Sequence, residues 1–448
     1  MLNKIKSVSK KIAISALALS KQQVKALRNK ANKANKISRA ENHFVALDIG
    51  TEYVKALIGK VNEDGSIDII GVGRRHQALS DMHAGAISDI ASVVENCDKA
   101  LTEAETQAGV SVRQTIIGIA GELVKGTTTT IKVARKTADI SIDIEEMEKI
   151  IHLVQERAEA KAKQQLAWEM GGKDVAIRLV NSALVSIEID GYPVTNPIGF
   201  QGRDVVIQLY TAFAPMIHIA ALEKTAQELD LDLLAVAAEP FAVARAVIGD
   251  KQNQNLSAIL MDVGGGTTDI AVIDEGGVQG TEMFGIGGRA YTRAIEREMG
   301  VSYDQAETLK ISFGTNQLPP QKRPAVEMAL TKTADVWISG IELALAEFSK
   351  LDSLPHRMFL CGGGASLGLL MERLEAEDWF KDLPLTRKPS VHLIRPEQVV
   401  GIKDVTGKIT DHTYITAMGL LRVGLDTMQF NGSEGSSIRE KLDRMLSV

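Results

Sequence analysis

Two short segments of this chain carry residues that together suit the binding of a phosphate group and a metal ion. Residues 261–273, MDVGGGTTDIAVI, repeat the pattern of residues 46–59, ALDIGTEYVKALIG. In each segment an apolar run ends in Asp, a turn follows through Gly and Thr, and a second apolar run begins. Asp48 and Asp262 are therefore predicted at the ends of buried strands, where carboxylates can hold Mg²⁺ through its waters.

The turns themselves supply groups that a phosphate needs. Glycine lets the backbone bring its N–H groups against phosphate oxygens, and threonine adds a hydroxyl donor. The candidate phosphate-binding residues are Gly50, Thr51, Gly264, Gly265, Gly266, Thr267 and Thr268. The simpler alternative is two ordinary hairpins with Gly-rich turns, which explains the first turn equally well when it is taken alone. Both turns in one chain favour a clamp in which two similar halves grip one phosphate tail.

The chain resembles the actin-like ATPase superfamily at five places, which occur in that superfamily's order. The two turn segments are similar to its two phosphate motifs. Residues 237–249 and 411–421 resemble its two connecting helices, and residues 358–367, MFLCGGGASL, resemble its adenosine motif. The resemblance implies an α/β fold with two lobes around a nucleotide, with ATP and Mg²⁺ as cofactors.

Within that superfamily the chain looks most like the FtsA family of bacterial cell-division proteins. Residues 79–101 resemble the stretch that leads to that family's inserted subdomain, and residues 196–202, NPIGFQG, resemble the element where the chain returns. Residues 285–314 have the family's Gly-Gly pair, helical run and Ala-Glu-apolar-Lys spacing. The resemblance extends over about residues 43–430 and weakens between 315 and 357.

The resemblance also implies roles for individual residues. Glu239 and Asp262 match positions that serve catalysis, with Glu239 orienting a water, whereas the alternative for Glu239 is a helix-start acid that interacts with the helix dipole. Glu307 and Lys310 match residues that hold the ribose and adenine, and their alternative is a solvated salt pair three residues apart. Gly362, Gly363 and Gly364 would let adenosine approach the backbone closely. ATPase activity is expected to be slow or absent, because fast turnover also needs a positioned water.

The motifs and periodicities predict six regions of the chain. A basic amphipathic arm (1–42) precedes the first lobe (43–80 and 173–255, with 411–430 returning to it), which is interrupted by an inserted subdomain (81–172). The second lobe (256–285 and 351–410) carries a helical subdomain over the adenosine side (286–350), and a linker with an amphipathic helix (431–448) ends the sequence.

Charge is distributed very unevenly along the chain. Residues 1–40 carry eleven Lys or Arg and no Asp or Glu, whereas the rest of the chain carries a net charge of −17. Apolar residues recur in this segment at helical spacing, which favours a helix lying on an anionic membrane. A solvated basic tail and a targeting peptide are the alternatives. Residues 438–448 form a second candidate anchor, with four apolar residues on one helical face.

Composition excludes several other classes of protein. Aromatic residues make up only 4% of the chain, which disfavours base-stacking surfaces, so nucleic acid is not an expected partner. The two cysteines do not suggest a disulfide framework, and the eight histidines lack the spacing of a zinc site. The sequence contains no apolar run of the roughly 20 residues that span a bilayer.

The FtsA resemblance implies a specific function. The expected protein lies peripherally on the cytoplasmic face of the cell membrane at the bacterial division site, self-associates into filaments, and tethers the tubulin-like division protein FtsZ. One alternative is a pilus-assembly protein of the PilM type, which shares the actin-like fold and an inserted subdomain. A small-molecule kinase of the same superfamily is the enzyme alternative, but the sequence offers no catalytic group beyond the nucleotide carboxylates.

Overall fold

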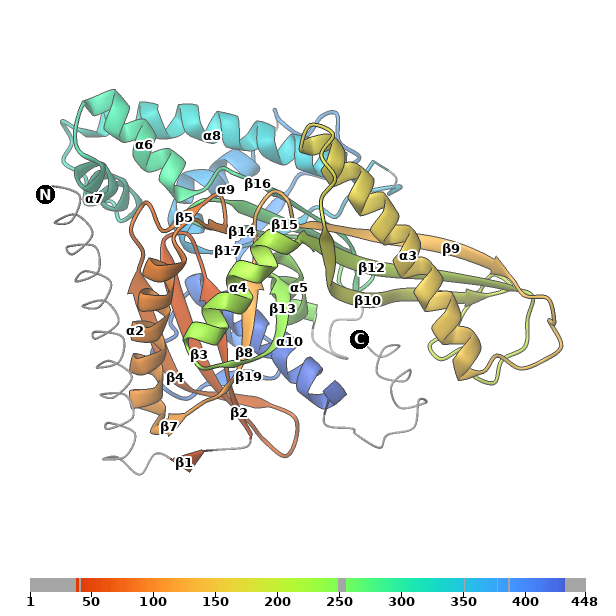
Figure 1. Cartoon of the computed structure of the whole chain (residues 1–448). Coiled ribbons are helices and arrows are strands. Elements are labelled where there is room, and N and C mark those ends of the chain that lie inside the picture. Colours follow the sequence, from red (N-terminus) through yellow and green to blue (C-terminus); the bar gives the residue numbers. More distant parts are fainter. Residues whose placement is uncertain are drawn as a thin grey trace, which may run out of the picture.

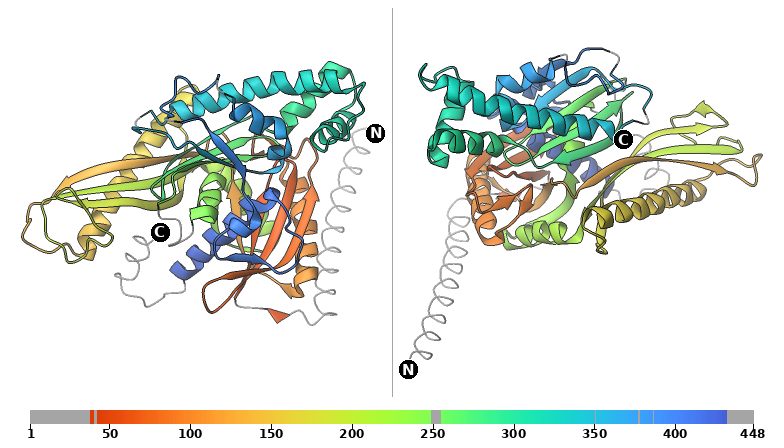
Figure 2. Two further views of the ribbon diagram at one scale, coloured as in Figure 1. Left: turned by 180° about the vertical axis from the view of Figure 1, so that it is seen from behind. Right: turned by 90° about the horizontal axis from the view of Figure 1, so that it is seen from above.

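The computed structural model describes residues 38–39, 42–248, 255–349, 351–376, 378–385 and 387–431. The expected C-terminal helix, and all of the basic arm except Ser38, Arg39 and Asn42, lie outside these ranges. Within the described residues, the helices are too short or too polar to cross a membrane. The chain forms two large β-sheets with helices packed around them, and a long extension projects from one side (Figures 1 and 2).

The first lobe, as we use the name, is the six-stranded sheet with its helices α2 (Ile90–Ala108) and α4 (Met216–Glu228). The strand order is β13 (Asp232–Ala238), β8 (Gln114–Ile119), β2 (His43–Ile49), β3 (Tyr53–Val61), β4 (Ile67–His76) and β19 (Ile402–Asp404). The three strands β2, β3 and β4 form an antiparallel meander. A Cβ at Gly73 of β4 would overlap the carbonyl oxygen of Ala100, so glycine in the sequence GVG allows α2 to lie directly on the strand.

The second lobe comprises one half of a nine-stranded sheet and the helices that cover it. Its strands lie in the order β16 (Gly277–Phe284), β15 (Thr268–Asp274), β14 (Ala258–Val263), β17 (Arg357–Cys361) and β18 (Ser390–Leu393). Its helices are α6 (Gly288–Met299), α7 (Tyr303–Gly314), α8 (Arg323–Ala346) and α9 (Gly368–Leu374). They bury an apolar cluster around the fully buried side chains of Trp337 and Tyr291.

The projecting extension, which we call the insertion, consists of residues 125–215. Its strands β9 (Lys125–Ala134), β12 (Asp204–Pro215), β10 (Ile177–Ile189) and β11 (Tyr192–Pro193) continue the nine-stranded sheet beyond β16. Helix α3 (Ile144–Glu169) packs on β9 and β12 and is seen along the projecting strands in both figures.

The extent of the insertion differs from the predicted range of 81–172. Helix α2 and strand β8, which fall within that range, pack in the first lobe, and the chain returns only after β12. The physical reason is that helical periodicity shows which face of α2 is apolar but does not show which sheet covers that face.

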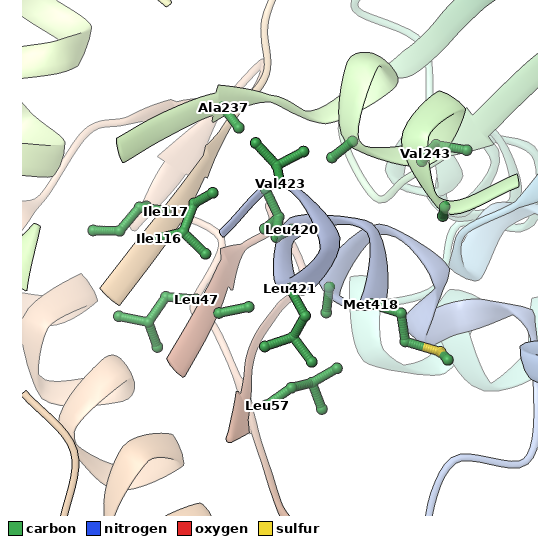
Figure 3. Packing of buried hydrophobic residues seen from close by; sticks show 14 of the residues in the cluster. Leu47, Leu57, Ile116, Ile117, Ala237, Val243, Met418, Leu420, Leu421 and Val423 are labelled. Atoms are coloured by element: carbon green, nitrogen blue, oxygen red, sulfur yellow. The ribbon is translucent and has the colours of Figure 1, made fainter. Parts of the chain in front are cut away.

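Two helices connect the lobes. Helix α5 (Glu239–Ile248) contacts strands of both sheets, and α10 (Ile415–Asn431) crosses it. A Cβ at Gly419 would overlap the carbonyl oxygen of Ala242, so the two backbones approach closely. Figure 3 shows Leu420, Leu421 and Val423 of α10 packed among side chains of the first-lobe sheet. The helices therefore form a tightly packed hinge between the lobes.

Candidate functional site

A cavity of about 400 Å³ lies between the two lobes and is lined by residues of both. Most of the residues that the sequence analysis selected line this single cavity. They are Asp48, Gly50, Thr51, Glu239, Asp262, Gly264, Gly265, Thr267, Glu307, Lys310, Gly362, Gly363 and Gly364. Five motifs spread over more than 300 residues of sequence thus meet at one place in the fold.

Two of the predicted phosphate-binding residues do not line the cavity. Thr268 is fully buried, where its hydroxyl donates to the carbonyl of Ile286 at 2.7 Å and accepts from Trp337 Nε1 at 2.8 Å. Its hydroxyl therefore stabilises the second-lobe core and is not available to a phosphate. Gly266 instead faces the first turn, because a Cβ there would lie 2.7 Å from Thr51 Oγ1.

The first turn joins β2 to β3 and is closed by its own backbone. The Gly50 N–H donates to the carbonyl of Tyr53 at 3.1 Å, and Gln77 Nε2 donates to the carbonyl of Gly50 at 2.8 Å. Asp48, the penultimate residue of β2, is buried and accepts from Lys55 Nζ at 2.7 Å. Lys55 comes from the facing position of β3, and sequence analysis did not select it.

Lys55 is held in its charged form although its side chain is largely buried. Burial alone would lower its pKa, but the carboxylates of Asp48 and Asp262 outweigh that effect and raise it. Its ammonium group lines the cavity beside the first turn. This group is suited to contact phosphate oxygens.

The second turn joins β14 to β15 and touches the first. Gly264 N–H donates to the carbonyl of Thr267 at 2.9 Å, which closes the turn. A Cβ at Gly265 would lie 2.9 Å from Glu52 Cβ, so even a small side chain there would press on the first turn. The two turns approach each other in the manner that a phosphate clamp requires.

Three buried carboxylates gather at the base of the cavity. One oxygen from each of Glu239, Asp262 and Asp269 lies within 4.8 Å of the other two. Burial, followed by the negative charge of neighbouring carboxylates, raises the pKa of Glu239 and of Asp269 well above its usual range. Burial also raises the pKa of Asp262, although the hydroxyl of Thr416 donates to that carboxylate.

This cluster suits a divalent cation. Asp269 Oδ1 is buried without a hydrogen-bond partner among the described residues, and its other oxygen accepts from Thr267 Oγ1 at 3.2 Å. A cation would supply the missing partner and offset the repulsion between the carboxylates. The predicted metal ligands were Asp48 and Asp262, whereas in the structure Asp48 is paired with Lys55, and Asp262 belongs to a cluster with Asp269 and Glu239.

Another part of the cavity lining has the features expected for an adenosine site. Gly362, with φ of 82°, begins the turn after β17, and the space in front of Gly363 is open. Lys310 Nζ lies 2.7 Å from Glu307 Oε2 and donates to the hydroxyl of Thr292 at 2.8 Å. Glu307 and Lys310 thus form the salt pair that was the alternative to a nucleotide-binding role, and both residues also line the cavity.

Comparison with known proteins relates most of the chain to one family. Residues 259–419 match the family described as "Cell division protein FtsA". The FtsA protein of Pseudomonas aeruginosa is 26% identical over 424 residues, which cover 89% of this chain and 94% of that protein. The FtsA protein of Streptococcus pneumoniae is 24% identical over 394 residues, covering 83% of this chain and 81% of that protein.

A solved structure agrees with the fold. A chain of a PilM-PilN type IV pilus biogenesis complex superposes with a TM-score of 0.59 and 16% identity, covering 87% of this chain and 99% of that chain. The predicted α/β actin-like fold and the resemblance to FtsA are therefore confirmed.

Proposed function

We propose that this protein is an ATP- and Mg²⁺-binding, membrane-associated actin-like protein of bacterial cell division. It self-associates into filaments and tethers the tubulin-like protein FtsZ to the cytoplasmic face of the membrane at the division site. The observation that carries this proposal is the convergence of both phosphate turns, the glycine turn and the carboxylate cluster on one cavity. The extended similarity to FtsA proteins connects that cavity with cell division.

Different groups of the cavity lining support different parts of nucleotide binding. The backbone N–H groups of the two turns and the ammonium group of Lys55 would hold the phosphates. Glu239, Asp262 and Asp269 would hold Mg²⁺, which neutralises phosphate charge when it is bound. Glu307, Lys310 and the turn from Gly362 to Gly364 would hold the adenosine.

Hydrolysis is proposed to be slow. Burial raises the pKa of Glu239 well above its usual range, which makes its carboxylate a stronger base than an ordinary one, as general-base catalysis favours. Rapid hydrolysis would require Glu239 to hold an attacking water in line with the terminal phosphate as well. In the proposed role nucleotide mainly sets the relation between the two lobes, which the hinge of α5 and α10 permits.

Nucleotide binding is tested by thermal unfolding of the purified full-length protein. ATP with Mg²⁺ at about 100 times its dissociation constant should stabilise the folded state by about 2.7 kcal/mol. Replacing Gly265 by Val should abolish this shift, since the side chain would enter the contact between the two turns. Normal ATP binding by Gly265→Val would show that the clamp is assigned wrongly.

The partner is tested by co-purification from the native host. Recovery of a tubulin-like protein would support the division role, and recovery of a pilus membrane protein would favour a PilM-like role instead. The likeness to a chain of the PilM-PilN complex is the specific observation that keeps this second candidate in view. Robust phosphorylation of a sugar would move the protein to the kinase class.

A further inference from the structure

One arginine of the second lobe reaches across the cleft to the first lobe. Arg289 lies in the first turn of α6, where its own N–H donates to the carbonyl of Gly265 at 2.8 Å. Its side chain leaves the second lobe entirely: Nε donates to Glu52 Oε2 at 2.7 Å and Nη2 donates to the carbonyl of Thr51 at 2.7 Å. The guanidinium group is thus bound to the first phosphate turn.

The same guanidinium group fastens a second segment of the first lobe. Nη1 lies 3.3 Å from the carbonyl oxygen of Leu79 and 3.4 Å from that of Met82. Met82 begins β5 (Met82–His83), which lies beside the start of α6 in Figure 1. Nearby, the N–H of Gly285 donates to Glu122 Oε1 at 2.7 Å, which adds a further contact at this edge.

The ion pair is sheltered from solvent. The Arg289 side chain is 12% exposed and that of Glu52 is 22% exposed. The second carboxylate oxygen of Glu52 lies 2.7 Å from His76 Nε2, so the orientation of Glu52 is fixed from its own lobe. Hydrogen bonds between charged groups are about twice as strong as neutral ones, and shelter from water limits their screening by salt.

The location of this contact relative to the hinge gives it a mechanical consequence. Helices α5 and α10 join the lobes through their packed cores, whereas Glu52 and Arg289, which both line the cavity, join the lobes through a side-chain contact beside the phosphate turns. Rotation of the lobes about the hinge would separate Glu52 from Arg289. Opening the cleft therefore requires that these contacts break first.

We propose that Arg289 and Glu52 form a clasp between the lobes, and that opening of this clasp limits nucleotide exchange. The inference rests on the nucleotide binding proposed above and adds the group that controls how fast nucleotide leaves. Arg289 is a positioning residue: it holds the two lobes together and does not act on the nucleotide itself. Its five donors make it suited to hold a carboxylate and backbone carbonyls at the same time.

The clasp is tested by displacing a fluorescent ATP analogue from the Mg²⁺-loaded full-length protein with excess ATP in a stopped-flow instrument. Glu52→Gln keeps the shape of the side chain but removes its charge, and release should become at least about tenfold faster. Arg289→Gln should accelerate release at least as much. The double variant should be no faster than Arg289→Gln, because both substitutions remove the same contact.

The insertion provides a matched control. Arg135 and Glu146 form an ion pair of similar length, 2.8 Å, within the insertion and away from the cleft. Glu146→Gln should leave the release rate unchanged. Release at the wild-type rate from both Glu52→Gln and Arg289→Gln, or equal acceleration by Glu146→Gln, would overturn the proposal.

Hydrogen exchange of the nucleotide-free protein tests the clasp separately from nucleotide binding. In Glu52→Gln the amides of residues 79–87 and 285–289 should exchange faster, while the strands of both sheets keep their protection and so show that the variant is folded. Unchanged exchange in these two segments would refute the clasp. A wild-type protein that binds no ATP would refute the proposed function and the control of exchange, and the amide data would then still decide whether the lobes are clasped.

Discussion

Substitution of Gly362 by Ala should couple a loss of stability to a loss of nucleotide binding. Gly362 lies between β17 and the glycine turn, with φ of 82° and ψ of 163°, a conformation that only glycine adopts readily. A Cβ at this position would overlap Asp262 Oδ1 and would lie 2.6 Å from the carbonyl oxygen of Val263, where ordinary contacts begin at 3.4 Å. The substitution therefore strains its own backbone and displaces a carboxylate of the proposed metal site.

The magnitude follows from these two effects. Holding Ala in this backbone conformation costs about 1–3 kcal/mol. A loss of 1 kcal/mol lowers the melting temperature by about 2–4 °C in a domain of 150–250 residues, so a fall of roughly 5 °C is expected. The displacement of Asp262 acts on Mg²⁺. Disturbing the support of a metal ligand typically weakens metal affinity by about 10- to 100-fold, and Mg²⁺-dependent ATP affinity should fall accordingly.

Two other glycines separate strain from displacement. Gly300, at the end of α6, has φ of 63° and open space around a Cβ, so Gly300→Ala should lower the melting temperature without changing ATP affinity. Gly363 is adjacent to Gly362 and has open space toward the cavity. Gly363→Ala should keep the melting temperature and weaken ATP binding, because its methyl group would stand where adenosine approaches the backbone.

The assay is differential scanning fluorimetry of all four proteins, followed by ATP titration at fixed Mg²⁺ in a calorimeter. If Gly362→Ala matched wild type in both melting temperature and ATP affinity, the close contact described between Gly362 and Asp262 would be wrong. If Gly363→Ala bound ATP as tightly as wild type, adenosine would not lie against this turn.

Three further predictions concern other parts of the chain. Glu239→Gln should slow any single-turnover ATP hydrolysis by a larger factor than it weakens ATP binding in a titration. Burial raises the pKa of Glu282 from 4.5 to about 7. Below pH 4.5 this carboxyl group is protonated in both the folded and the unfolded protein. Above pH 7 it is ionised in both, and its burial then destabilises the folded state. Glu282→Gln should therefore raise the unfolding free energy by at most about 3 kcal/mol above pH 7 and leave it unchanged near pH 4.5, as urea titrations would show. Deleting residues 2–40 should remove most co-sedimentation with anionic vesicles and deleting residues 436–448 should remove less, with high salt weakening the intact protein. Full loss on removing only the C-terminal residues would refute the dominance of the basic arm.

The phosphate turns and the glycine turn were predictable because their information is local. An apolar run that ends in Asp and is followed by Gly and Thr defines a strand, its end and its turn within about ten residues. Asp48, Asp262 and Gly362 were placed correctly at strand ends for this reason. Their convergence on one cavity depended on the order of five motifs, which the resemblance to actin-like proteins supplied.

The extent of the insertion and the fate of Thr268 depend on contacts between distant parts of the chain. Helix α2 belongs to the first lobe because Gly73 of β4 lets it approach, and local periodicity contains no information about that pairing. Thr268 follows Thr267 directly and has the same chemistry. Thr267 is the last residue of the turn and lines the cavity, whereas Thr268 begins β15 and its hydroxyl meets Trp337, which lies 69 residues later in the chain.

The two phosphate hairpins differ at one equivalent position, and that difference determines where the metal should bind. In the first hairpin the residue seven positions after Asp48 is Lys55, and in the second the residue seven positions after Asp262 is Asp269. Strand register places each of these residues directly opposite its aspartate. The first hairpin therefore presents a neutralised ion pair, whereas the second presents two carboxylates that Glu239 joins from α5.

This asymmetry gives the phosphate tail two different neighbours. The ammonium group of Lys55, in the first lobe, can contact the negatively charged phosphate directly. The carboxylates of the second hairpin can bind the phosphate only through a cation. A charge reversal that replaces Asp269 by Lys would then make the hairpins alike and remove the need for metal. In Asp269→Lys, ATP affinity should become nearly independent of Mg²⁺, whereas in the wild type chelation of Mg²⁺ should weaken ATP binding strongly. Equal Mg²⁺ dependence in the two proteins, measured by ATP titration with and without a chelator, would show that Asp269 is not part of the metal site.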